Sequence, residues 1–164
     1  MVIVLLAEGF EEVEALAPVD IMRREGIDVR TVSIGKRYVT GAHGISVRAD
    51  MTADEVNEAE VSAVVFPGGM PGSLNLDASP YANEFIAAAT MNGGHIAAIC
   101  AAPLVLGRRG LLRGKRATCF PGFEGELTGA TVTGEPVVTD GNITTARDFR
   151  AALAFGDELA RILK

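Results

Sequence analysis

A cysteine at the end of an apolar run is the residue of this 164-residue chain best suited to covalent chemistry. Cys100 follows the run 93–99 and is followed at once by Ala101, Ala102 and Pro103. This pattern is typical of a nucleophile elbow, where a buried strand turns sharply into a helix and needs small neighbours. A thiol at a helix N-terminus also meets free N–H groups and the positive end of the helix dipole, which favour the thiolate. The alternative is that Cys100 is a small core residue, because free cysteines are often buried.

Four glutamates follow the first apolar run of the chain: Glu8, Glu11, Glu12 and Glu14. A helix would place Glu11 and Glu14 near one face, which leaves Glu12 as the outward residue. A carboxyl group near a thiol could accept or donate a proton, especially if burial raises its pKa toward neutrality. The alternative, which should explain most of the four, is that acidic residues at a helix N-terminus favour the dipole.

A second loop, residues 67–72 (PGGMPG), follows another apolar run. Bare backbone of this kind can present N–H groups to an oxyanion, although the loop could equally be an ordinary turn. It lacks the ending of a P-loop and the spacing of a dinucleotide fingerprint, so no nucleotide cofactor is predicted. The two cysteines, Cys100 and Cys119, show neither a disulfide framework nor a metal-binding spacing. We therefore predict no metal, reduced thiols, a cytoplasmic location and a core position for Cys119.

The elements that must position these residues alternate between strand and helix, which predicts a parallel sheet covered by helices on both faces. Ligand sites in such sheets lie beyond the carboxyl ends of the strands, where the loops after Leu6, Phe66 and Ile99 would meet. We predict strands at 2–6, 27–34, 61–66, the elbow strand, 117–119, 137–139 and 143–146, and a hairpin of 38–40 with 45–47. We predict helices at 11–25 with a kink at Pro18, 52–55, 80–91, after the elbow, and 148–163.

The composition of the chain favours a single globular domain and argues against a nucleic-acid-binding or membrane-spanning protein. The chain is most simply one domain, 1–164, long enough to bury a sizeable core. Its formal net charge is -6 and its basic residues are scattered, which argues against nucleic-acid binding. No apolar run is long enough to span a membrane, and the short apolar N-terminus lacks the basic flank of a signal peptide.

Taken together, the three loops resemble the DJ-1/PfpI (ThiJ) superfamily, and most closely its DJ-1 branch. The order and separation of the matching blocks agree with the family, and the resemblance covers nearly the entire chain. These blocks are AEGFEEVE (7–14), PVDIMRREGI (18–27), FPGG (66–69) and AAICAAP (97–103).

The resemblance implies a flavodoxin-like three-layer α/β sandwich with a mostly parallel central sheet, usually dimeric. It implies that Cys100 is the reactive elbow cysteine and that Glu14 is the glutamate whose protonated carboxyl hydrogen-bonds the sulfur. It also assigns the N–H groups of Gly69 and Ala101 as the donors around the thiol and any oxyanion formed there.

The functions implied for the chain fall into several classes. One is a cofactor-independent glyoxalase that converts small 2-oxoaldehydes to 2-hydroxy acids, or a deglycase that acts on their adducts. The alternatives are a redox-sensing or chaperone-like protective protein that works through oxidation of Cys100, and a catalytically silent binding module. A cysteine protease or amidase is less favoured, because such members usually carry a histidine where Ala101 stands.

The histidines depart from the DJ-1 pattern. DJ-1-like proteins commonly place a histidine near the cysteine from the segment after the elbow helix, but residues 120–141 contain none. His95 begins the elbow strand, at the end opposite Cys100, and is therefore predicted to be structural. His43 lies in the hairpin that the resemblance places near the dimer interface, and is a candidate accessory residue facing the partner's site. The alternative for His43 is a solvated turn residue.

Overall fold

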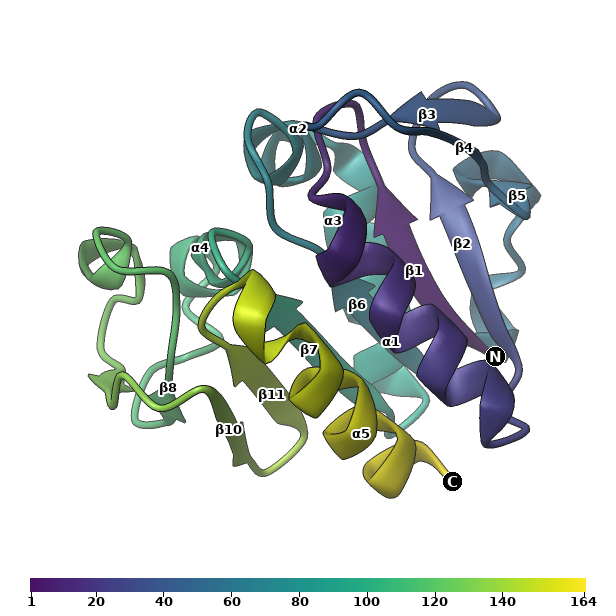
Figure 1. Cartoon of the computed structure of the whole chain (residues 1–164). Coiled ribbons are helices and arrows are strands. Elements are labelled where there is room, and N and C mark those ends of the chain that lie inside the picture. Colours follow the sequence, from purple (N-terminus) through teal and green to yellow (C-terminus); the bar gives the residue numbers. More distant parts are fainter.

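A seven-stranded sheet forms the middle layer of the computed structural model, which describes all residues 1–164 (Figure 1). The strand order is β10-β11-β7-β6-β1-β2-β5. Every neighbouring pair is parallel except β10 with β11 at one edge. The strands are β1 (Val2–Leu6), β2 (Val29–Ser33), β5 (Met51–Thr52), β6 (Ala63–Phe66), β7 (His95–Ile99), β10 (Val137–Asp140) and β11 (Ile143–Ala146).

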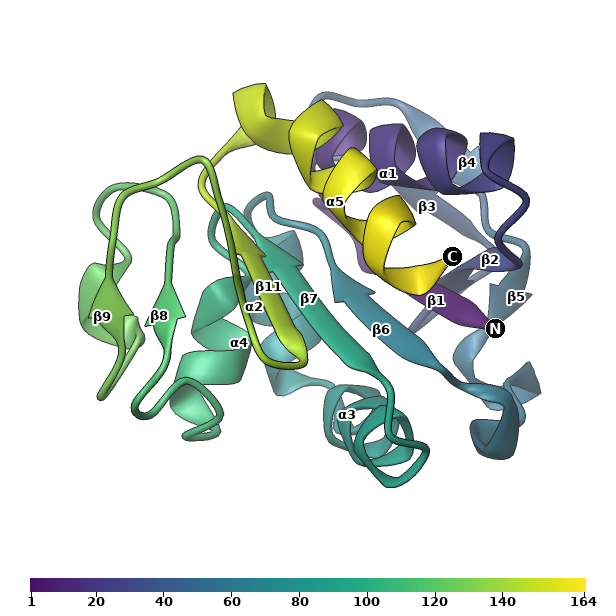
Figure 2. The ribbon, with the colours of Figure 1, turned by 90° about the horizontal axis from the view of Figure 1, so that it is seen from below.

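Helices cover both faces of this sheet, as the alternating pattern predicts (Figure 2). One face carries α1 (Glu12–Arg24) and α5 (Ala152–Leu163), which pack against each other. The other carries α2 (Gly72–Ala78), α3 (Pro80–Met91) and α4 (Pro103–Arg108). Successive side chains of a strand point to opposite faces. Ile3 and Leu5 therefore enter one core cluster, whereas Val4 enters the other. The central strands are continuous apolar runs because both of their faces are buried.

Several predicted helices and strands begin or end at other residues in the structure, and a few elements were not predicted at all. The strands predicted at 27–34 and 61–66 are shorter, and the strand predicted at 117–119 is β8 (Arg116–Ala117). The short helix predicted at 52–55 is a 3₁₀ turn, Ala53–Glu55, in which the Glu55 carboxylate accepts the Thr52 N–H. The last helix begins as a 3₁₀ turn, Phe149–Ala151, before α5. Helix α1 continues through Pro18, and the kink expected there stays a prediction. The pattern did not predict α2, β5 or β9 (Thr131–Val132).

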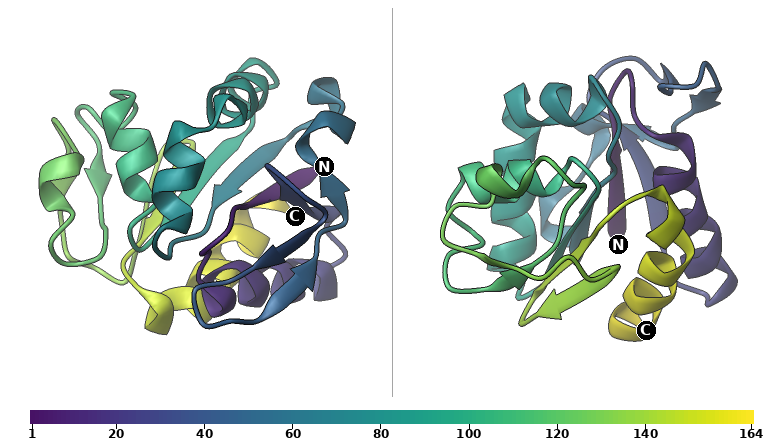
Figure 3. Two further views of the ribbon diagram at one scale, coloured as in Figure 1. Left: turned by 90° about the horizontal axis from the view of Figure 1, so that it is seen from above. Right: turned by 60° about the vertical axis from the view of Figure 1, so that its left-hand side comes forward.

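A small hairpin lies over the carboxyl edge of the sheet beside the start of α1 (Figure 3, left). It pairs β3 (Tyr38–Thr40) with β4 (Ser46–Arg48), one residue later than predicted for the second strand. The Gly9 N–H donates to the Thr40 carbonyl, and the Ala42 N–H donates to the Phe10 carbonyl. These bonds attach the hairpin to the loop after β1, where the candidate glutamates are found.

None of the helices combines the length and the apolar character that crossing a membrane would require.

Candidate active site

Cys100 lies at the corner between β7 and α4, in the conformation expected of a nucleophile elbow. Its φ of 67° is in the left-handed region, and no other non-glycine residue of the chain has a positive φ. A side chain is strained there, so the surrounding structure must hold it in place. The Cys100 N–H donates to the Ala146 carbonyl at 2.9 Å, and its carbonyl accepts the Phe120 N–H at 2.8 Å. These bonds anchor the corner to β11 on one side and to the segment after β8 on the other.

The Cys100 sulfur is surrounded by groups from all three predicted loops. The N–H groups of Ala101 and Gly69 and the carboxyl of Glu14 are its polar neighbours and act on its pKa. Burial raises the pKa of the thiol well above its usual range, and the charge of Glu14 adds to this effect, whereas the two amides lower the pKa. The amides therefore favour the thiolate, as expected of a helix N-terminus, but burial and the charge of Glu14 outweigh them.

Glu14 enters the site from the first turn of α1 and is fully buried. Its Oε2 accepts the Gly68 N–H at 3.0 Å, and its Oε1 is buried without an N–H or O–H partner. Burial raises the pKa of Glu14 to about 7, the interaction with Cys100 lowers it, and the charge of Glu11 raises it again. A carboxyl group with such a pKa can both accept and donate a proton near neutral pH. In its neutral form Glu14 no longer opposes ionisation of the thiol.

Gly68 and Gly69, which follow β6, allow Glu14 and Cys100 to approach each other. A Cβ added to Gly68 would lie 2.6 Å from Cys100 Cβ and would also overlap the Glu14 carboxylate. Gly69 has φ of 93°, and a Cβ there would overlap the backbone nitrogen of Glu11. The backbone of Gly68 therefore lies directly against both other loops, and that of Gly69 lies against the loop after β1.

Replacing Gly68 with alanine should force Glu14 and Cys100 apart. We expect the free energy of unfolding to fall by about 1–3 kcal/mol, the usual cost of overpacking, as measured by denaturant unfolding. Gly125→Ala is the matched control, because a Cβ at Gly125 meets nothing within 4 Å. Equal stability of Gly68→Ala and Gly125→Ala would contradict the close approach of the three loops.

Glu12 is not outward as the helical spacing indicated, but buried, with 6% of its surface exposed. The β3–β4 loop folds over the first turn of α1, and Glu12 Oε1 accepts the His43 N–H at 2.7 Å and the Ile45 N–H at 3.3 Å. Burial acts to raise the pKa of Glu12, but the hydrogen bonds from His43 and the loop lower it overall. Glu11 caps α1, since its Oε2 accepts the Glu14 N–H at 2.9 Å. Glu11 therefore stabilises the N-terminus of the helix, as one alternative for the acidic residues held. Glu12 instead anchors the hairpin to the helix.

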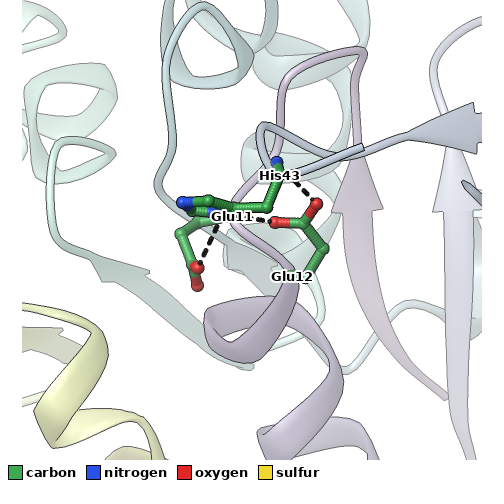
Figure 4. A group of neighbouring side chains, drawn as sticks. All are labelled: Glu11, Glu12 and His43. Carbon is green, nitrogen blue, oxygen red and sulfur yellow. Dashed lines mark hydrogen bonds and ion pairs between the residues drawn. The ribbon is translucent and has the colours of Figure 1, made fainter. Parts of the chain in front are cut away.

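Neither histidine contacts the sulfur of Cys100. His43 has a side chain that is 69% exposed, and its Nδ1 lies 2.9 Å from Glu12 Oε2 and 3.5 Å from Glu11 Oε1 (Figure 4). It lies in the turn of the hairpin and is held there by two carboxylates, and its accessory role at a partner's site stays a prediction. His95 is buried at the start of β7, where its Nε2 lies 2.8 Å from Thr144 Oγ1. Cys119 is buried in the core, and burial raises the pKa of its thiol to about 11.

Comparison with known proteins decides the family. The model of the DJ-1/PfpI family matches residues 1–162. The chain belongs to the DJ-1/PfpI family. Deglycase PfpI of Pyrococcus furiosus is 34% identical over 166 residues, which cover 99% of each chain. Protein dj-1beta of Drosophila melanogaster is 34% identical over 165 residues, covering 96% of this chain and 88% of that protein.

Solved structures of DJ-1 superfamily proteins confirm the fold. A cysteine-to-alanine mutant of a DJ-1 superfamily protein from Salmonella typhimurium superposes with a TM-score of 0.91 at 38% identity, over 99% of this chain and 89% of that chain. Oxidized DJ-1 of Toxoplasma gondii superposes with a TM-score of 0.92 at 32% identity over the same shares. The α/β sandwich with a mostly parallel sheet, expected from the resemblance, is therefore correct.

Asp148 is a residue of this DJ-1/PfpI site that the sequence analysis missed. It is buried two residues after the end of β11, and its charge contributes to the raised pKa of Glu14. Its carboxylate accepts the Arg150 N–H at 3.0 Å and pairs with Arg147 at 3.1 Å. The position of Asp148 in the sequence could have revealed it. Because β11 is parallel to β7, the carboxyl end of β11 reaches the same edge of the sheet as Cys100.

Proposed function

We propose that the chain is an enzyme of the deglycase type that uses Cys100 and Glu14 on small 2-oxoaldehydes or their adducts, without a cofactor. Relatives named deglycase support this activity, because they are about one-third identical over almost the entire length of both chains. The observation that carries the proposal is the meeting of a thiol, a buried carboxyl with a pKa of about 7 and two N–H donors at one edge of the sheet.

These groups suffice for the conversion of a 2-oxoaldehyde to a 2-hydroxy acid. The sulfur attacks the aldehyde carbon, and the thiol proton passes to the carbonyl oxygen, which gives a hemithioacetal. Glu14 as carboxylate removes the hydrogen of that carbon as a proton and returns it to the neighbouring carbon, while the hydroxyl proton of the hemithioacetal passes to the neighbouring oxygen, which forms the thioester of the 2-hydroxy acid. Water then cleaves the thioester, releasing the hydroxy acid and restoring the thiol. One carbon is oxidised and its neighbour is reduced, so no external electron acceptor is needed.

The amides and the carboxyl have separate roles in this scheme. The N–H groups of Gly69 and Ala101 face the sulfur and can stabilise an oxyanion on the attached carbon. Glu14 carries out the two proton transfers at carbon, which suits a group that is half protonated near pH 7. A histidine at the thiol is not required, because no step needs a second base.

The experiment that tests the function follows methylglyoxal and its product together. Purified protein should consume methylglyoxal and form lactate in equal amounts. A parallel assay on the adduct of methylglyoxal with a small thiol distinguishes free aldehyde from adduct as the preferred substrate. Failure to consume either compound faster than buffer alone would contradict the proposal.

A redox-responsive protective protein is the second candidate. The same N–H donors and the protonated carboxyl could stabilise a sulfinate at Cys100, and a structural relative is an oxidized DJ-1. Peroxide would supply both oxygen atoms in two successive two-electron oxidations of the sulfur. Limited peroxide treatment should then add two oxygen atoms to wild-type protein but not to Cys100→Ser, as read by intact mass. Equal oxygen gain in both proteins would exclude this role for Cys100.

A further inference from the structure

Next to the thiol site, the first turn of α1 and the β3–β4 loop bring together three groups that bind metals. They are the carboxylates of Glu11 and Glu12 and the imidazole of His43 (Figure 4). One ligand atom from each lies within 4.8 Å of the other two. None of the three side chains is among the partners of the Cys100 sulfur, so the cluster is distinct from the proposed catalytic pair.

Each carboxylate is held by the backbone through one oxygen and has the other directed at the imidazole. Glu12 Oε1 accepts the N–H groups of His43 and Ile45, and its Oε2 faces His43 Nδ1. Glu11 Oε2 accepts the Glu14 N–H, and its Oε1 faces the same nitrogen. Ligating carboxylates in metal sites are oriented by hydrogen bonds in the same way. The cluster is therefore pre-oriented by its surroundings.

The spacing of these atoms matches a single coordination shell. His43 Nδ1 lies 2.9 Å from Glu12 Oε2 and 3.5 Å from Glu11 Oε1. Two ligands that are each bound at about 2.1 Å, at octahedral or tetrahedral angles, are about 3.0–3.4 Å apart. The two carboxylate oxygens lie within 4.8 Å of each other, so the three atoms can surround one ion after a small adjustment of the side chains.

We propose that Glu11, Glu12 and His43 bind one Zn²⁺ ion. One imidazole nitrogen with two carboxylate oxygens suits zinc better than calcium or magnesium, which prefer ligand sets made of oxygen alone. The side chain of His43 is 69% exposed, so an ion can enter and water can complete its coordination. Bound zinc replaces the proton that would otherwise link His43 to Glu12, and it joins the β3–β4 loop to α1.

The test is a zinc titration by calorimetry on chelator-treated Cys100→Ser protein, in which the half-buried thiol is removed as a competing ligand. We expect one ion per chain, and at least tenfold weaker binding when His43→Ala or Glu11→Gln is added. Glu8→Gln is the matched control, because Glu8 is an exposed glutamate of the same loop outside the cluster. That change should leave the affinity within twofold, and calcium should not displace the zinc.

A second measurement needs no change to the cluster itself. The chain has only two histidines, so both imidazoles can be followed by NMR during the titration. One equivalent of zinc should shift the ring nitrogens of His43 and leave those of buried His95 unchanged. The proposal is overturned if the His43 ring does not respond, or if His43→Ala binds zinc as tightly as the parent. In either case the three groups form only an ion pair between a protonated His43 and the glutamates.

Discussion

Cys100→Ser should consume methylglyoxal at least about 10³-fold more slowly than the wild type, because a serine hydroxyl without a dedicated base is a poor nucleophile at neutral pH. The loss should appear in kcat, since the side chain keeps its size and the surrounding amides remain in place. The measurement is the initial rate of lactate formation under identical conditions. Denaturant unfolding of both proteins verifies that the fold survives the substitution.

Cys119→Ser is the control for this change. Cys119 is the other thiol of the chain and is buried in the core, and its side chain is not among the groups that act on the Cys100 sulfur. Its replacement should lower stability slightly and leave the turnover per folded molecule unchanged. Equal turnover by wild type and Cys100→Ser would show that the elbow cysteine is not the nucleophile.

Glu14→Gln should lower kcat for the same reaction by about 10²–10⁴-fold, the usual contribution of a positioned acid or base. Glutamine fills the same space and can still contact the loop after β6, but it cannot move a proton between the two carbons of the substrate. Its effect should therefore fall on kcat rather than on KM, as determined from full saturation curves.

Glu8→Gln again provides the comparison, because Glu8 is exposed and has no contact with Cys100. It should retain wild-type kcat within about twofold. If Glu14→Gln behaves like Glu8→Gln, then another group carries out the proton transfers and the proposed mechanism is wrong.

Much of the scaffold could be predicted from sequence because it depends on local pattern. The runs that became β1, β6 and β7 are apolar throughout, which is expected of parallel strands buried on both faces. Their carboxyl ends lie at one edge, so the loops carrying Glu14, Gly69 and Cys100 were expected to meet. The structure places the Gly69 N–H and the Glu14 carboxyl at the Cys100 sulfur.

The remaining features depend on contacts between distant segments. Glu12 is buried only because the β3–β4 loop, some thirty residues later, folds over it. Helix α2 begins at Gly72 and contains Ser73 and Asn75, all weak helix formers, so propensity gave no signal for it. The raised pKa of the Cys100 thiol likewise follows from burial and from Glu14, neither of which a helix N-terminus reveals.

The coupling of Cys100 to Glu14 is tested most directly by the pH dependence of thiol alkylation. Burial raises the pKa of Glu14 to about 7, so its carboxylate forms as the pH rises through neutrality and then opposes the thiolate. In chelator-treated wild-type protein, the alkylation rate of Cys100 should therefore rise less steeply above about pH 7. In Glu14→Gln the inflection should be absent and the rate at pH 8 higher than in wild type. Superimposable profiles for the two proteins would contradict the coupling.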